Sequence, residues 1–365
     1  MKVYKQYSNN TFLGISNFDT SDVTDMSWMI IECYKLISLD LSSLDTSNAT
    51  DMSWMFYSCH ELTSLDISNF KTNKATNMEW MFGSCYKLAS LDLSNFDTSN
   101  VTDMNGMFWG CIKLTSINLN NFDTSKVTYM NGMFNGCNSL TFLDLSSFNT
   151  SKVTDMSRMF CNCRKLKTLD LSNFKTNKVT NMSSILEGCI SLKSLDLSSF
   201  NASKVSRMNS MFDGCSSLTS LDLSNFKTSK TKYMNGMFKN CKKLISLNIS
   251  NFNTSNVTDM DWMFYNCSSL PILDLSSFDF SNVKYIDNMF TDCKSLTDLK
   301  FGKNLKISID LSDCPLTHES ALSVIDGLSN VEEQQSLMFN KKIFLELLDN
   351  EIKLAKDKNW KIGCY

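Results

Sequence analysis

Hydrophobic and polar residues along most of this chain follow one pattern that returns every 26 residues. Cysteine marks it most clearly, because it recurs at this spacing from Cys33 to Cys293 and only three cysteines lie outside the series. Leucine, methionine and phenylalanine recur with the same period, and eleven copies fill residues 13–298 without an insertion. A unit this short cannot bury a core of its own and must stack on its neighbours, so the pattern predicts a solenoid.

Each repeat predicts the same short elements. Leu91 and Leu93 flank Asp92, an alternation typical of a strand with leucine inward and aspartate outward. A polar corner and a second extended stretch follow. A capping residue such as Asn105, then Met-Phe, then Gly110 before the cysteine predicts one short helical turn that ends at a left-handed residue.

The two ends depart from the repeat. Residues 1–12 predict a partial coil or an N-terminal cap, and residues 13–298 hold the eleven repeats. The period breaks after Gly302, and residues 299–365 predict a C-terminal cap of mixed α and β structure. Within this cap we expect a strand near 307–311, a helix from Thr317 and an amphipathic region over 344–358. Such a cap covers the core that the last coil would otherwise expose.

The repeat resembles the BspA-like leucine-rich repeats of bacterial surface proteins, of the 26-residue type that ends in Met-Phe-x-Gly-Cys. The resemblance implies a right-handed, leucine-rich-repeat-like coil with a parallel β-sheet. It also implies a location at the cell surface or outside the cell and an adhesive or host-contact role. The first residues lack the apolar core of a signal peptide.

Composition excludes several classes of function. The net charge of −3 argues against a nucleic-acid-binding protein, and no apolar run is long enough to insert into a membrane. Only two histidines occur, and no nucleotide-binding, zinc-protease or serine-hydrolase motif is present. We therefore expect no enzyme activity, no cofactor and no metal site.

The cysteine series has two interpretations, a metal or disulfide ladder or a column of buried small hydrophobic residues. An odd number of cysteines cannot pair completely, and stacked side chains that point the same way suit disulfides poorly. Zinc sites need close pairs, and Cys161 with Cys163 is the single close pair. We favour free buried thiols, with Cys161 more exposed than the others.

A column of aspartates should project from the sheet face, where like charges on neighbouring strands repel one another. One interpretation is a solvated acidic face, and the other is a weak cation-binding or calcium-binding face. The column comprises Asp40, Asp66, Asp92, Asp144, Asp170, Asp196, Asp222 and Asp274. A separate lysine stripe runs from Lys126 to Lys230 and is interpreted as a solvated edge.

Aromatic residues gather in the variable columns of the early repeats. A column that holds Gly106 and Gly132 elsewhere carries tryptophan in three successive coils, which indicates an exposed interface or packing against a partial N-terminal coil. The candidate binding residues are Trp28, Trp54 and Trp80, flanked by Tyr57, Tyr86 and Trp109.

These observations favour a non-enzymatic binding or adhesion protein that recognises a protein or glycan through one solenoid face. Self-association through the aromatic strip is a further option. The alternative is a structural spacer or assembly component, for example of a virion or surface layer, without a ligand. An enzyme would need a pocket, which the irregular region 302–365 could provide.

Overall fold

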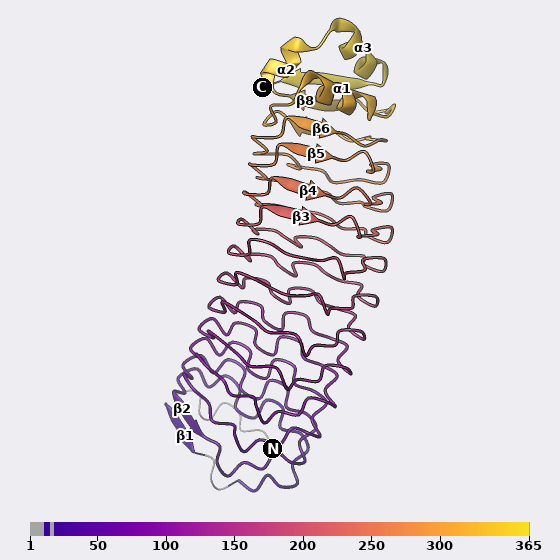
Figure 1. Ribbon diagram of the computed structural model, residues 1–365. Coiled ribbons are helices and arrows are strands. Elements are labelled where there is room, and N and C mark those ends of the chain that lie inside the picture. Colours follow the sequence, from indigo (N-terminus) through magenta and orange to yellow (C-terminus); the bar gives the residue numbers. More distant parts are fainter. Residues whose placement is uncertain (1–10, 15–17, 365) are drawn as a thin grey trace. The chain divides into compact units, whose positions relative to one another are not determined.

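The computed structural model describes residues 11–14 and 18–364. The chain forms two compact units: Met1–Val179 with Gly188–Ser191, and Thr180–Glu187 with Leu192–Tyr365. Within each unit the backbone runs in flat coils that stack on one another (Figure 1). The predicted leucine-rich-repeat-like solenoid is confirmed. Residues 1–10, which hold most of the expected partial coil, lie outside the described residues.

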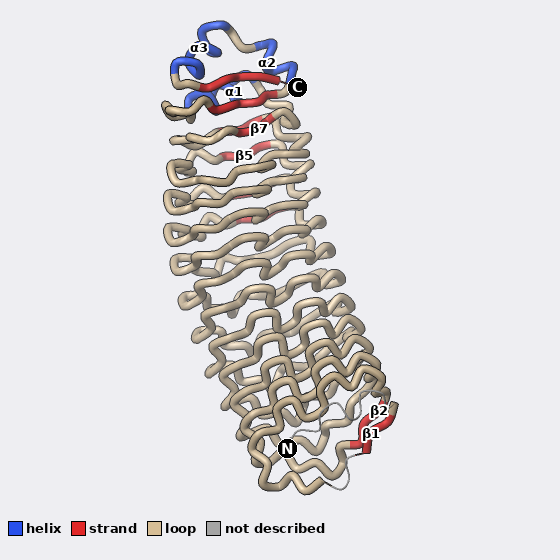
Figure 2. Tube along the Cα trace, turned by 180° about the vertical axis from the view of Figure 1, so that it is seen from behind, coloured by secondary structure: helices blue, strands red, loops and turns tan. Residues whose placement is uncertain are grey.

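Short parallel strands join neighbouring coils. In the first unit β1 (Phe12–Gly14) pairs with β2 (Ser38–Asp40). In the second unit β3 (Ser220–Asp222) pairs with β4 (Ser246–Asn248), and β5 (Ile272–Asp274) with β6 (Asp298–Lys300). Elsewhere the described coils are extended or turning backbone (Figure 2). Single bridges such as Asp51 to Asn77 keep the 26-residue register there.

Two successive turns occupy the segment where the sequence predicted a helical turn. The Met81 amide donates to the Met78 carbonyl, and the Cys85 amide donates to the Phe82 carbonyl. In each turn the third residue has positive φ, 54° at Trp80 and 60° at Ser84, the sign that a type II turn requires. The alternate amides, including that of Trp80, donate to the next coil instead of along a helix. The predicted left-handed residue before the cysteine is therefore present without a helix.

The core consists of the predicted columns of Leu, Val, Met, Phe and Cys, which are buried in most of the described coils. The first leucine column of the strand is half-buried at Leu39, Ile117, Leu195 and Leu247. None of the 14 cysteines forms a disulfide. Cys161 is 4 % exposed, more than any cysteine of the 26-residue series as predicted, yet it is still buried. The periodic thiols also donate hydrogen bonds. Cys85 Sγ lies 3.2 Å from the Phe56 carbonyl oxygen, and the same bond recurs coil after coil up to Cys293. The thiol therefore acts as a small hydrophobic group and as a donor between coils.

A buried threonine column lies at the corner that the sequence analysis placed outside the core. Thr124 is fully buried, and its hydroxyl donates to the carbonyl oxygen of Asn149 in the next coil at 3.1 Å. The Thr124 hydroxyl oxygen also accepts a hydrogen bond from the Asn149 amide at 2.7 Å. Ala202 occupies this column in the second unit and cannot make these bonds. A hydrophobicity pattern misses the column because threonine scores as polar.

The end of the second unit is closed by a cap. A parallel sheet forms in the order β7 (Ile309–Leu311), β8 (Gln335–Phe339), β9 (Trp360–Cys364). The helices are α1 (His318–Asp326), α2 (Lys341–Glu346) and α3 (Asp349–Asp357). The expected amphipathic region is thus two helices, α2 and α3, broken at Leu347 and Leu348.

Helix α1 takes the place of a further coil beside β6. Thr317 caps its N-terminus, as the sequence suggested, by accepting the Ser320 amide. Ser320 Oγ accepts the Leu299 amide and Ser323 Oγ accepts the Phe301 amide, each at 2.9 Å. The helix therefore supplies hydrogen-bond acceptors that the next coil would have provided.

We predict that Thr124→Val lowers the free energy of unfolding by about 1–3 kcal/mol, because an amide and a carbonyl of Asn149 lose their buried partner. Ala202→Thr should raise it by about 0.5–1.5 kcal/mol by adding the same pair of bonds. Urea denaturation followed by circular dichroism measures both. Thr102→Val, at an exposed position, is the matched control. Equal effects of Thr124→Val and Thr102→Val would contradict the assigned role.

We also predict that stability falls steeply in alkaline solution. Burial raises the pKa of Cys85 from about 9 to about 12, and burial raises the pKa of Cys111 and Cys163 as well. Between these two pKa values the folded state keeps thiol protons that the unfolded state releases. The contribution of the buried thiols to the free energy of unfolding is therefore fully present below about pH 9 and is lost as pH rises towards 12. Each such thiol contributes a slope of about 1.4 kcal/mol per pH unit.

Urea midpoints measured from pH 8 to 11 test this prediction. Cys85→Ala should lower stability at neutral pH, because the Phe56 carbonyl loses a donor, yet it should flatten the alkaline decline. An alkaline slope that Cys85→Ala leaves unchanged would show that the thiol does not titrate with unfolding.

Candidate aromatic surface

Four tryptophans of the first unit form one continuous stack, which we call the aromatic strip. The ring centroids of Trp28 and Trp54 lie 5.0 Å apart and those of Trp54 and Trp80 lie 5.1 Å apart, with interplanar angles of 9° and 16°. Trp109 continues the series with its ring centroid 4.9 Å from that of Trp80 and tilted by 35°. Tyr57 packs edge-on against Trp54 and Trp80 at 4.6 and 5.7 Å. The structure therefore brings five of the six predicted binding residues together.

The sixth predicted residue, Tyr86, belongs to a second aromatic ladder in the same coils. His60 lies between Tyr34 and Tyr86, with ring centroids 5.0 and 4.4 Å away. Tyr34 and Tyr86 are 41 % and 38 % exposed. Burial lowers the pKa of His60, which favours the neutral ring. His60 was not among the predicted binding residues, although Tyr34, His60 and Tyr86 recur at 26-residue spacing and so form a readable signal.

The backbone beneath the strip is left-handed. Trp28, Trp54 and Trp80 have φ of 63°, 59° and 54°, and Gly106 occupies the same column with φ of 55°. Glycine thus appears in this column because the turn needs positive φ, which tryptophan adopts at a cost of about 1–2 kcal/mol. Stacking contributes about 0.5–1.5 kcal/mol for each aromatic pair and offsets that cost.

Glycines make room for the rings of the strip. A Cβ atom at Gly106 would lie 2.6 Å from the Trp80 ring. Trp109 lies against Gly132 in the same manner. Each of these rings leans over the bare backbone of the coil that follows. The flat faces inside the stack are therefore covered, and the exposed part of the strip consists of the ring edges and the outer face of Trp28.

Acidic side chains flank the strip. Burial raises the pKa of Glu79, the nearby negative charge of Asp103 adds to the shift, and hydrogen bonding to the Trp54 side chain partly opposes it. Glu79 stands where other coils carry Ser53 or Asn105. The strip is therefore an apolar ridge with a negative border.

The aspartate column of the sheet face has a local structural role. Asp92 Oδ1 accepts the Ser94 amide at 2.9 Å, and the same bond forms at all the other aspartates of the column. Asn118 makes it in their place with the Asn120 amide at 3.1 Å. This bond lowers the pKa of Asp92. The carboxylates are therefore held in turns of three residues, with one oxygen committed to the backbone.

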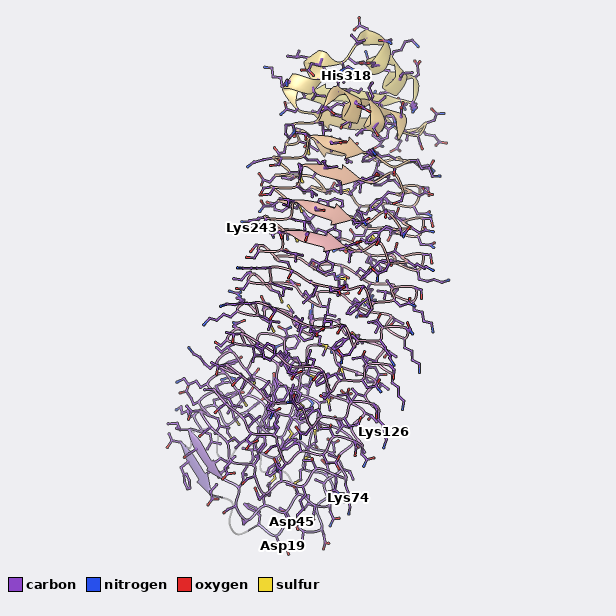
Figure 3. All side chains as sticks on the ribbon, viewed as in Figure 1. Asp19, Asp45, Lys74, Lys126, Lys243 and His318 are labelled. Atoms are coloured by element: carbon purple, nitrogen blue, oxygen red, sulfur yellow. The ribbon has the colours of Figure 1, made fainter. Side chains whose placement is uncertain are left out.

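The lysine stripe lies along a corner of the coils. Lys74 and Lys126 follow one edge of the first unit (Figure 3). Their Nζ atoms donate to Asn48 Oδ1 at 2.6 Å and to Asn100 Oδ1 at 2.7 Å in the preceding coils. These lysines thus bond to asparagines of their own column.

The second unit carries one further tryptophan in the strip column, which the sequence analysis did not single out. Trp262 is 40 % exposed and has φ of 55°. Lys239 Nζ lies 5.6 Å from its ring centroid and 3.8 Å from Asp213. The structure thus shows a cation over an indole face in this column, with a carboxylate beside the cation.

Among residues 11–14 and 18–364, no cluster of three or more histidine, cysteine, aspartate or glutamate side chains could hold a metal ion. The same described residues include no helix long and apolar enough to cross a membrane.

Sequence comparison places the repeats in one family. The family model described as "Mycoplasma protein of unknown function, DUF285" matches residues 1–91, 85–189, 165–247 and 219–308. The match covers most of the chain, and the predicted resemblance to BspA-like repeats is confirmed. No curated protein matches the chain.

Solved structures with a similar course of the backbone are leucine-rich repeat proteins and receptor complexes. A leucine-rich repeat protein from Bacteroides ovatus is 17 % identical with a TM-score of 0.34, over 87 % of this chain and 88 % of that protein. A TLR13–ssRNA13 complex is 18 % identical with a TM-score of 0.29, over 96 % and 53 %. The Toll–Spatzle complex of Drosophila is 14 % identical with a TM-score of 0.28, over 92 % and 42 %. Likenesses this weak say nothing about what the chain binds.

We predict that the aspartate column supports turns and does not depend on a cation. Asp92→Asn should leave the melting temperature nearly unchanged, because an amide oxygen can still accept the Ser94 amide, as it does at Asn118. Asp92→Ala should lower it. Differential scanning calorimetry with and without 1 mM calcium chloride tests both points. A large calcium-dependent rise that Asp92→Asn abolishes would favour the cation-binding interpretation.

Proposed function

We propose that this chain, which belongs to the DUF285 family, is a non-enzymatic binding protein that recognises a protein or glycan through the aromatic strip of its first unit. The stack of Trp28, Trp54, Trp80 and Trp109 carries this proposal. Tryptophan and tyrosine dominate binding hot spots because they offer large contact areas with few rotatable bonds.

The strip stands apart from the rest of the repeat in a way that supports binding. The turns of each coil need positive φ in this column, and glycine or serine satisfies that need in Gly132, Ser184 and Ser210. Tryptophan at this position adds apolar ring edges to an outer surface, and Trp28 remains 36 % exposed. The core of each coil is complete without these rings, because the Leu, Met, Phe and Cys columns fill it.

An adhesive role at the cell surface or outside the cell is part of the same proposal, and it comes from the resemblance to BspA-like repeats. The proposal needs no catalytic group. A repeated scaffold suits recognition because each coil presents side chains in fixed columns, and a few exchanges within one column create a local surface.

We predict that replacing Trp28, Trp54 and Trp80 together by serine abolishes binding and leaves most of the stability. Serine is tolerated in this column at Ser184 and Ser210. The labelled chain would be applied to a glycan microarray and to a panel of immobilised purified proteins, including the unlabelled chain itself. We expect at least one interaction that the triple variant weakens by ten-fold or more, with a melting temperature lowered by a few degrees.

Trp262→Ser is the matched control, because it removes an indole from the same column outside the strip. It should leave the interaction unchanged. If the triple variant unfolds, the rings belong to the core. If the folded triple variant keeps every interaction of the wild type, or if the wild type binds nothing on the panels and does not self-associate, the binding proposal is wrong and the spacer alternative is favoured.

A further inference from the structure

The ring geometry of the aromatic strip restricts what can bind there. A pyranose ring binds an indole by lying on its flat face, but neighbouring rings within the strip stack at 9° and 16° and cover each other's faces. Tyr57 covers further parts of Trp54 and Trp80. Apart from the outer face of Trp28, what remains exposed is a ridge of ring edges, which fits an apolar protein surface better than a glycan.

The charge distribution within the first unit indicates which protein surface that is. Residues 18–110 contain thirteen acidic and four basic residues, whereas residues 111–179 contain four acidic and nine basic residues. The aromatic strip lies in the acidic part. The basic part of the same unit therefore has the complementary charge.

Two arginines carry that positive charge in the aromatic columns themselves. Arg158 occupies the strip column, with the same positive φ of 55°, and Arg164 occupies the Tyr34 column. Both are exposed, and no ion-pair partner of either occurs among the described residues. The amide of Gly132 donates to the carbonyl of Ser157 at 2.8 Å, which fixes Arg158 one coil beyond Gly132.

The strip column thus reads tryptophan in coils 1–3, glycine in coils 4 and 5, and arginine in coil 6, where coil 1 contains Trp28. Such a face matches itself when a second copy is turned end to end. A two-fold axis between coils 3 and 4, perpendicular to the stacking direction, places coil 1 of each copy against coil 6 of the other. Trp28 and Tyr34 then face Arg158 and Arg164 of the second copy.

We propose that the occupant of the aromatic strip is a second copy of this chain, docked antiparallel through coils 1–6 of the first unit. The inference rests on the proposed function, and it names the partner of the same surface. At each end, arginine meets aromatic rings and the carboxylate of Glu32, next to Tyr34. The second unit shows the same chemistry within one chain, where Lys239 lies over Trp262 beside Asp213.

The expected complex is weak and sensitive to salt. Six coils spaced by ~4.8 Å give a face about 25 Å long. A face of this length buries an area at the small end of the range for specific interfaces. Charged contacts at both ends of this face are screened by salt. We therefore expect dissociation constants in the micromolar range at 50 mM sodium chloride and weaker pairing at 500 mM.

Sedimentation velocity of the purified full chain from 5 to 200 µM tests the proposal. The wild type should dimerise, and Arg158→Glu with Arg164→Glu should weaken dimerisation at least ten-fold. Glu32→Arg and Arg164→Glu should each weaken it alone and restore it when combined in one chain. Lys204→Glu with Lys230→Glu, at exposed positions of the second unit, makes the same charge change and should have no effect.

A wild type that stays monomeric at 200 µM overturns the inference, and so does a dimer that the arginine variants leave intact. Neither result overturns the proposed function if a glycan or another protein on the panels binds the wild type and not the triple tryptophan variant. Binding of a glycan at the strip would instead show that a ring face is available and that the partner class is wrong.

Discussion

Within each unit, a coil must satisfy its backbone by bonding to the coils before and after it. A 26-residue coil has few hydrogen bonds within itself beyond its turns, and its alternate amides donate to carbonyls 25 residues ahead, as Met78 does to Asp103. That bonding holds only if the coils stay in register, so each side chain lies beside its counterpart in the next coil. The rest of the structure follows from this stacking of like on like.

Stacking is favourable for apolar columns and difficult for polar ones. Phenylalanine rings such as Phe82 and Phe108 stack at 5.8 Å, and methionine and leucine fill the remaining core. The threonine, cysteine and aspartate columns are stable because each side chain bonds to backbone and not to its like. Thr124 bonds to the next coil, Cys85 to the coil before it, and Asp92 to its own turn.

Side-chain amides follow the same rule. Asn95 donates to the carbonyl oxygens of Ile67 and Phe70 in the preceding coil, at 2.9 and 2.8 Å. Asn121 repeats this arrangement one coil later, with Leu93 and Phe96 as acceptors. A charged column without such bonds would place like charges about one strand spacing apart, where they repel.

The sequence predicts those parts of this arrangement that depend on the spacing of hydrophobic residues. The period, the inward Leu, Met, Phe and Cys columns and the strand at Ile309 are evident from spacing alone. The threonine column was missed because its burial depends on two hydrogen bonds to another coil, and no local pattern shows them. The helical turn was predicted because Asn105 and Gly110 resemble helix caps, yet two turns with positive φ use the same residues.

Glycine in the strip column distinguishes the two positive-φ turns from a helical turn. Gly106, Gly132 and Gly236 all recur at the third position of the first turn, where a helix would disfavour glycine. Small residues in this column indicate that it does not fill the core. The column does lie outside the core, but glycine occurs there because the turn needs positive φ, and this requirement makes tryptophan at the same position conformationally costly.

In a solenoid of this kind, the residues that serve a function are those that differ from the residue usual at that position of the repeat. A residue that every coil shares maintains the stack, whereas a residue found in a few coils is not needed for stacking and has another reason to be there. Within the first unit, Trp28, Trp54 and Trp80 at one end of the strip column and Arg158 at the other are such departures, and they lie on turns that the core does not require. The register then decides which departures meet, because side chains in one column are held about one strand spacing apart along the stack. A run of three aromatic residues therefore becomes a ridge, and an arginine three coils beyond the last of them has a fixed place on the same face.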